Sequence, residues 1–208
     1  MNAALDVRAN IVGLVFFPPS PRAVTPLGGA DLAAVARERA MIAALLVDAE
    51  DQLIRDVMAR VNPDILQLHG RETPQRVSDI RACFGKPVMK AIGVSGADDL
   101  RAVPDYEAVA DRILYDAMPP KDADRPGGHG RAFDWNLLAN VPRRKPMMLS
   151  GGLTPENVAD AVRIVRPDGV DVSSGVEDSP GVKNAGKIAA FVANARAAEQ
   201  KFLQEKVS

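Results

Sequence analysis

The sequence predicts an α/β protein built on one parallel sheet, and two observations carry this prediction. Seven short apolar runs recur along the chain, and most are nearly continuously apolar, as parallel strands covered on both faces tend to be. Amphipathic stretches separate these runs at intervals of roughly 22 to 35 residues, which favours strands joined by right-handed helical crossovers. Seven strands suit either an open doubly wound sheet or a (β/α)8 barrel that lacks one strand.

The individual elements follow from local signals. Each apolar run marks one expected strand, and the runs are IVGLVFF from Ile11, MIAALLV from Met41, DILQLH from Asp64, PVMKAIGV from Pro87, RILYDA from Arg112, PMMLS from Pro146 and GVDVSS from Gly169. Three helices are expected to begin at Thr25-Pro26, Thr73-Pro74 and Thr154-Pro155. In each, the threonine hydroxyl caps the first turn and proline fits the first helical position.

The composition excludes several classes of protein. Of the 208 residues, 47% are hydrophobic and 25% are charged, as in a folded globular protein. Lys and Arg number 26 against 27 Asp and Glu, a net charge of -1, so we expect no nucleic-acid or membrane partner. The single cysteine excludes a disulfide framework and a multi-cysteine metal site.

One domain covering residues 1–208 is expected, because no linker-like stretch divides the chain. No apolar run reaches the ~20 residues of a membrane span, and the first residues lack the basic and apolar segments of a secretory signal, so we expect a cytoplasmic protein. The sequence leaves monomer and homodimer both open. The longest polar segment, residues 119–131, follows an expected strand and is interpreted as a functional loop.

Polar residues gather where the expected strands end. The carboxyl ends of parallel strands meet at one edge of a sheet, where α/β folds keep their active sites, so we expect these residues to share one rim. Alternation along a strand also places Gln67 on the face of His69, and Asp171 on that of Ser173. The predicted rim residues are Arg22, Gln67, His69, Asp116, Gly151, Gly152, Asp171, Ser173, Ser174 and Gly175.

Two turns after consecutive strands predict a phosphate site. They read LSGGL from Leu149 and DVSSGV from Asp171. Glycine-bearing turns expose backbone N–H groups that can cradle a phosphate, and in barrels the loops after strands seven and eight often have this role. Either turn alone is a common loop sequence, so the prediction depends on their occurrence together.

Several residues also have ordinary structural explanations. Arg22 and His69 could be surface residues, and Asp116 could be a turn former after a strand. Lys90, within PVMKAIGV, is left open between the rim and a carboxylate partner. Cys83 is interpreted as a small apolar packing residue on a helix.

At these residues the chain closely resembles the phosphoribosylanthranilate isomerases of tryptophan biosynthesis. The matching stretches are GLVFFPPSPRAV, LQLHGRE, KAIGV, ILYDA, PGGHGRAFDW, LSGGLTPENV and VDVSSGVEDSPGVKN, in the family's order. They cover nearly the whole chain, from Ile11 to Lys187. The related indoleglycerol-phosphate synthases share the SGG turn but not the FDW and DVSSGVE stretches together.

The resemblance implies a (β/α)8 barrel that rearranges phosphoribosyl anthranilate, an aminoaldose, into an aminoketose without a metal or organic cofactor. It implies that Asp116 is the general acid that protonates the furanose ring oxygen. Arg22 is expected to contact the anthranilate carboxylate and Asp171 the sugar hydroxyls, with Gln67 and His69 lining the site. The phosphate is expected to lie on the two turns, at Gly151, Gly152, Ser173, Ser174 and Gly175.

One departure from the family concerns the general base. The family begins with a strand reading approximately Lys-Ile-Cys-Gly, whose cysteine removes the C2′ proton. This chain opens at residues 2–6, which resemble the end of the first helix, and Cys83 is expected at the opposite end of the barrel. We therefore expect an N-terminally incomplete barrel of seven strands, with two unpaired edges that make it poorly stable or dependent on association.

Three hypotheses follow for the function. The first is an isomerase whose first strand is missing from this chain. The second is a phosphosugar-binding barrel, a pseudoenzyme or truncated form, that has lost proton abstraction. The third is a different phosphosugar enzyme that uses another base at the rim.

Overall fold

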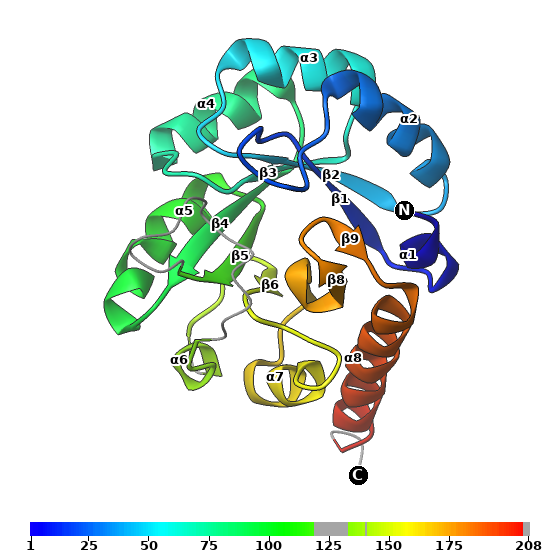
Figure 1. Ribbon diagram of the computed structural model, residues 1–208. Helices are drawn as coiled ribbons and strands as arrows, with labels where there is room; N and C mark the ends of the chain where they lie inside the picture. The colour runs from blue at the N-terminus through cyan, green and yellow to red at the C-terminus, as the bar shows by residue number, and fades with distance from the viewer. Residues whose placement is uncertain (119–132, 140, 206–208) are drawn as a thin grey trace.

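A seven-stranded parallel sheet forms the centre of the molecule, as the sequence predicts. The computed structural model describes residues 1–118, 133–139 and 141–205. The strands pair in chain order, and the sheet curls so that the helices surround it (Figure 1). They are β1 (Ile11–Val15), β2 (Met41–Leu46), β3 (Ile65–Leu68), β4 (Val88–Val94), β5 (Arg112–Ala117), β6 (Met147–Leu149) and β7 (Gly169–Val170). Among the described residues, no further strand extends the sheet beyond β1 or β7.

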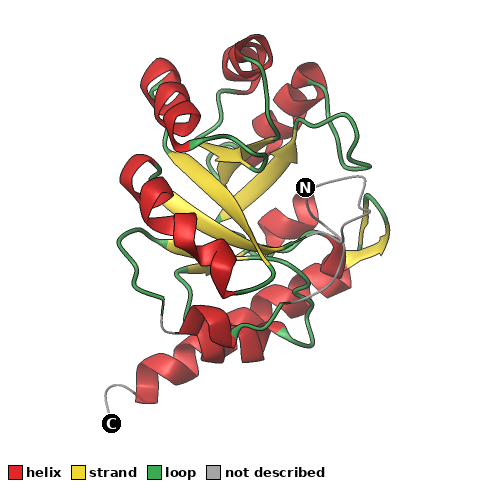
Figure 2. Ribbon diagram, turned by 90° about the vertical axis from the view of Figure 1, so that its left-hand side faces the viewer, coloured by secondary structure: helices red, strands yellow, loops and turns green. Residues whose placement is uncertain are grey.

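Helices cover the outer, convex side of this sheet (Figure 2). They are α1 (Asn2–Asp6), α2 (Pro26–Ala36), α3 (Asp51–Val61), α4 (Pro74–Phe84), α5 (Val103–Val109), α6 (Asn136–Ala139), α7 (Val158–Val165) and α8 (Ala185–Glu205). Two short 3-10 helices, η1 (Ala97–Ala102) and η2 (Ser174–Val176), and a hairpin of β8 (Glu177–Ser179) and β9 (Val182–Lys183) complete the fold. The helix at residues 2–6 confirms the expectation for the start of the chain.

Two of the three predicted helix starts are confirmed. Thr25 accepts a hydrogen bond from the N–H of Gly28, and Thr73 accepts one from the N–H of Arg76. The third prediction is wrong, because α7 begins at Val158 rather than directly after Thr154. Thr154 instead stabilises a turn, since its hydroxyl accepts the N–H of Glu156 while its own N–H donates to the side chain of Asn157.

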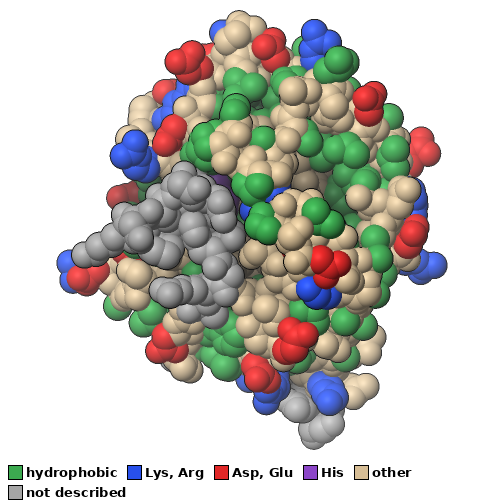
Figure 3. Space-filling model, viewed as in Figure 1, with side chains coloured by type: hydrophobic (Ala, Val, Ile, Leu, Met, Phe, Trp, Pro, Cys, Tyr) green, Lys and Arg blue, Asp and Glu red, His purple; other side chains and the backbone are tan. Residues whose placement is uncertain are grey.

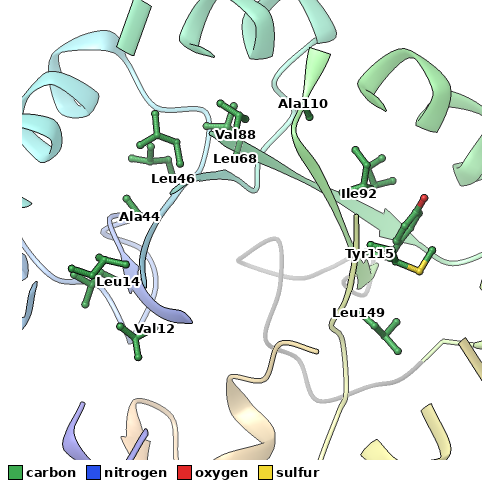
Figure 4. Close-up of a cluster of buried hydrophobic side chains, with 14 of the residues drawn as sticks. Val12, Leu14, Ala44, Leu46, Leu68, Val88, Ile92, Ala110, Tyr115 and Leu149 are labelled. Carbon is green, nitrogen blue, oxygen red and sulfur yellow. The ribbon is translucent and has the colours of Figure 1, made fainter. Parts of the chain in front are cut away.

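The strands place their side chains in two apolar layers. Even-numbered residues of β1, β2 and β4 point outward against the helices, where they form the larger core shown in Figure 4. The inner layer is smaller and fills the interior of the curled sheet; its buried residues are Ala43, Ile65, Met89, Ala91, Leu114 and Met148. Gln67 and Asp116 come two residues after Ile65 and Leu114, so they stand on this inner face at the carboxyl ends of their strands.

Aspartates fix the amino ends of three strands. Each one donates its backbone N–H to a carbonyl at the start of the preceding strand and accepts the N–H of that same residue on its carboxylate, with distances of 2.7–2.9 Å. The pairs are Asp64 with Ile42, Asp111 with Val88 and Asp168 with Met147. These bonds lie at the end of the sheet opposite the predicted rim and hold the strand register there.

Cys83 corrects one expectation. It lies near the end of α4, just before the amino end of β4, and so at the end of the barrel opposite the active site, as the sequence predicts. Its side chain is exposed, so it is not the apolar packing residue that the sequence suggested. The surface side of α4 carries it because the buried residues of that helix are Val77 and Ile80.

Candidate active site

His69 and Asp116 meet at the carboxyl ends of β3 and β5. The distance from His69 Nε2 to Asp116 Oδ2 is 3.0 Å, and the Gln67 amide nitrogen lies 3.2 Å from His69 Nδ1. A neutral imidazole with its proton on Nε2 satisfies both contacts, donating to the carboxylate and accepting from the amide. Gln67 and Asp116 are each only 5% exposed. A histidine is visible at the centre of this end of the molecule (Figure 3).

A second carboxylate, Asp171, follows β7 and approaches the same centre. Its Oδ2 accepts a hydrogen bond of 3.0 Å from the Ser150 hydroxyl, at the end of β6. Loss of hydration raises the pKa of Asp171; the Ser150 hydrogen bond opposes this rise, and the nearby Asp116 charge adds to it. The rim therefore contains two carboxyl groups, and the charge of Asp116 disfavours ionisation of Asp171.

The two glycine turns lie side by side. Gly151 and Gly152 have φ angles of +84° and +66°, a region that favours glycine. Gly175 approaches the first turn so closely that a Cβ there would stand 1.9 Å from the carbonyl oxygen of Leu153. Within the described residues, the backbone N–H groups of Gly152, Ser174 and Gly175 have no hydrogen-bond acceptor. Such groups can bind an anion.

Arg22 forms a bidentate ion pair with Glu177, just beyond the second turn. Arg22 Nε and Nη2 lie 2.7 and 2.6 Å from the two carboxylate oxygens, and the side chains are 11% and 4% exposed. Lys183 donates to the same carboxylate at 2.8 Å and to the carbonyl of Ser173 at 2.8 Å. Burial favours the neutral form of Glu177, but the hydrogen bonds from Arg22 and Lys183 outweigh it and hold the pKa of Glu177 at about 2.

The structure brings most of the predicted residues to one end of the sheet and adds two that the sequence reasoning missed. Glu177 and Lys183 belong to the stretch VDVSSGVEDSPGVKN, so they were within the resemblance but carried no separate chemical signal. Lys90 does not face the rim, because it pairs with Glu72 on the helix side of β4. The loop predicted at residues 119–131 lies outside the described residues.

The described part of the chain holds neither a helix that could span a membrane nor a cluster that could hold a metal ion. None of its helices is long and apolar enough to cross a membrane. Residues 1–118, 133–139 and 141–205 also contain no cluster of His, Cys, Asp and Glu side chains suited to a metal ion.

Known proteins resemble the chain in both sequence and structure. The family model for N-(5'phosphoribosyl)anthranilate (PRA) isomerase matches residues 1–194. An N-(5'-phosphoribosyl)anthranilate isomerase of Rhodopseudomonas palustris (strain BisA53) is 56% identical over 96% of this chain and 91% of its own length. Its counterpart in Bradyrhizobium diazoefficiens is 53% identical over 96% of this chain and 89% of its own length.

Solved structures agree with this relationship. The phosphoribosyl anthranilate isomerase of Thermotoga maritima is 35% identical, with a TM-score of 0.85 over 94% of this chain and 92% of its own. A phosphoribosyl anthranilate isomerase bound to reduced 1-(o-carboxyphenylamino)-1-deoxyribulose 5-phosphate has a TM-score of 0.81 at 33% identity, over the same shares of both chains. The curled parallel sheet is thus the (β/α)8 barrel fold, represented here by seven strands, and the chain belongs to the N-(5'-phosphoribosyl)anthranilate isomerase family.

Proposed function

We propose that this site converts N-(5-phosphoribosyl)anthranilate into 1-(2-carboxyphenylamino)-1-deoxyribulose 5-phosphate, with Asp116 as the general acid. The observation that carries the assignment is the position of Asp116 on the inner face at the end of β5. It is 5% exposed and held by His69 at 3.0 Å. A carboxyl group fixed in this way can deliver a proton to one atom of a bound substrate.

The first step opens the sugar ring. The carboxyl group of Asp116 gives its proton to the furanose oxygen, and the bond from C1′ to that oxygen breaks with its electron pair leaving on the oxygen. The lone pair of the anthranilate nitrogen forms the C1′=N bond of a Schiff base. Loss of the C2′ proton from the protonated Schiff base then gives an enolamine, which becomes the ketone when C1′ gains a proton and the C2′ hydroxyl loses one.

The other rim residues are assigned to binding. The backbone N–H groups of Gly152, Ser174 and Gly175, and the Lys183 charge beside Ser173, are assigned to binding the substrate phosphate. Gly151 shapes the first turn, and the hydroxyls of Ser173 and Ser174 complete the phosphate site. Asp171 is assigned to the sugar hydroxyls, with Gln67 and His69 lining the same face.

Arg22 is assigned to the anthranilate carboxylate, as a charge-assisted pair. Its Nε and Nη2 already bind Glu177, so the substrate carboxylate is expected at Nη1.

No described residue is assigned to removal of the C2′ proton. The only cysteine of the chain, Cys83, lies on α4 toward the amino ends of the strands, whereas Asp116 lies at their carboxyl ends. Because the two ends are separated by the apolar interior of the sheet, Cys83 does not reach the substrate.

The test compares Asp116→Asn with Asp105→Asn, an exposed aspartate on α5. Turnover is followed by the loss of substrate and binding by titration with the reduced product. Asp116→Asn is expected to lower turnover by at least about 10²–10⁴-fold while analogue affinity stays close to that of the unchanged protein. Asp105→Asn is expected to change neither.

Two outcomes would overturn the proposal. Undiminished turnover in Asp116→Asn would remove this residue from the acid step. Tight analogue binding by the unchanged protein without any turnover would instead support the binding-protein hypothesis.

A further inference from the structure

A buried ion pair lies behind the active site and takes no part in the reaction described above. Lys90 Nζ is 2.8 Å from Glu72 Oε2, and both side chains are 3% exposed. Val88 and Ile92 of β4 pack in the helix-facing core (Figure 4). Lys90 lies two residues from each of them, so its side chain is on the same side of the sheet and not on the substrate side. Isolating two charges from water in this way is costly unless further hydrogen bonds satisfy them.

Most of those hydrogen bonds go to the loop that carries His69. Lys90 Nζ donates to the carbonyl of Gly70 at 2.7 Å and to that of Leu68 at 3.3 Å. The Glu72 carboxylate accepts the N–H of Gly70 at 3.0 and 3.1 Å. The ion pair therefore binds the backbone on both sides of His69.

The same carboxylate also ties this loop to the one before it. Glu72 Oε1 accepts the N–H of Asp48 at 2.9 Å, and Asp48 in turn accepts the N–H of Arg71. The two loops are so close that a Cβ on Gly70 would stand 2.5 Å from Asp48 Oδ1 and 2.6 Å from its backbone nitrogen. Gly70 is required at this approach, and the loop has little room to move.

Tyr106 closes the far side of the ion pair. Its hydroxyl donates to the carbonyl of Glu72 at 3.0 Å, and Lys90 Nζ lies 5.7 Å from the centre of its ring. The network thus runs from the layer of α5, through Lys90 and Glu72, to the peptide groups that flank His69. The side chain of His69 then contacts Asp116 at 3.0 Å.

We infer that Lys90 and Glu72 are positioning residues, which fix the backbone around His69 so that its imidazole holds the Asp116 carboxyl in place. This inference rests on the proposed function of Asp116. A displacement of about 1 Å at a reacting group can cost about 10²-fold in rate, so loss of the network is expected to lower kcat by about 10- to 100-fold. KM is expected to change far less, because neither residue faces the substrate.

The experiment uses Lys90→Met, Glu72→Gln and the paired variant Lys90→Met with Glu72→Leu. Replacing both members of a buried pair with apolar residues often leaves stability unchanged or raises it. The paired variant removes the unpaired charge that each single variant leaves but not the loss of the backbone hydrogen bonds, so it is expected to recover part of the melting temperature lost in the single variants and none of the lost kcat. A purely structural role predicts that both recover together. Lys86→Met, two residues before the start of β4, is the matched control.

A second measurement does not require turnover. The chain has two histidines, so the ring nitrogen chemical shifts of His69 are assigned by comparison with His69→Asn. In Lys90→Met and Glu72→Gln they are expected to move toward the values found in Asp116→Asn, and to stay unchanged in Lys86→Met. Unmoved shifts in folded Lys90→Met and Glu72→Gln would overturn the inference. Full activity of Asp116→Asn would overturn the proposed function instead, whatever these shifts show.

Discussion

Arg22 and Glu177 connect the two edges of the curled sheet. Arg22 follows β1 and Glu177 follows β7, and these strands form the two edges of the sheet among the described residues. Two hydrogen bonds of 2.6 and 2.7 Å connect the side chains across the rim. At the other end of the barrel, Arg196 on α8 donates to the carbonyls of Val7 and Arg8 beside α1. Side-chain hydrogen bonds therefore connect the segments next to β1 and β7, the two edge strands, which do not pair with each other.

The first prediction concerns the stability of this connection. Glu177→Ala leaves the partly buried Arg22 charge without its partner, which is expected to lower the free energy of unfolding by about 3 kcal/mol, the lower end for a broken buried pair. Urea unfolding measures it. Asp178→Ala removes the neighbouring carboxylate, which is exposed, and is expected to cost much less. Equal losses of unfolding free energy in the two variants would show that the Arg22–Glu177 pair stabilises the fold no more than an exposed ion pair does.

The second prediction concerns acid. The pKa of Glu177 is about 2 in the folded protein and 4.5 ordinarily, so folding favours its charged form. The stabilisation is complete above about pH 4.5 and is lost as the pH falls toward about 2. As the pH is lowered through this window, the free energy of unfolding is expected to decrease less steeply in Glu177→Gln than in the unchanged protein. Parallel curves for the two proteins would contradict the assignment.

Much of the fold is predictable from the sequence because it depends on local pattern. The seven strands are confirmed because each is a short, mostly apolar run; Lys90, in the middle of β4, is a polar exception. The caps at Thr25 and Thr73 are confirmed for the same reason. Thr154 is different, because its segment also forms the glycine turn after β6. The Asn157 side chain accepts a hydrogen bond from the N–H of Thr154 and stabilises that turn. The competing turn delays the helix to Val158.

The site was predictable in outline but not in its contacts. Strand ends and alternation place His69 and Asp116 at one rim, but their hydrogen bond depends on the curl of the sheet. The partners of Lys90 and Arg22 lie 18 and 155 residues away in the chain. Charge alone could not select Glu72 or Glu177 among 27 acidic residues.

The third prediction concerns Gly151. A Cβ at this position would stand 2.1 Å from the backbone nitrogen of Ala117 and 2.8 Å from Asp116 Oδ1, at a φ of +84°. Gly151→Ala is therefore expected to displace the Asp116 carboxyl and to lose turnover, with about 1–3 kcal/mol of destabilisation from the backbone angle. Melting temperature and turnover measure the two effects. Gly96→Ala is the control, because its Cβ meets nothing within 4 Å, and full turnover in Gly151→Ala would contradict the prediction.

The fourth prediction concerns the charge of Asp171. Loss of hydration raises the pKa of this carboxyl, the Ser150 hydrogen bond opposes that rise, and the negative charge of Asp116 adds to it. Ser150→Ala removes the opposing hydrogen bond, so the pKa of Asp171 is expected to rise further, and a carbon NMR titration of the carboxyl measures it. Ser78→Ala on α4 is expected to leave this titration unchanged.

The Ser150→Ala substitution is also expected to change the pH dependence of binding. A neutral Asp171 accepts hydrogen bonds from sugar hydroxyls less well than a carboxylate does. As the pH is lowered, analogue affinity is therefore expected to begin falling at a higher pH in Ser150→Ala than in the unchanged protein. An unchanged pH dependence of affinity, together with a shifted titration, would show that Asp171 does not bind the sugar.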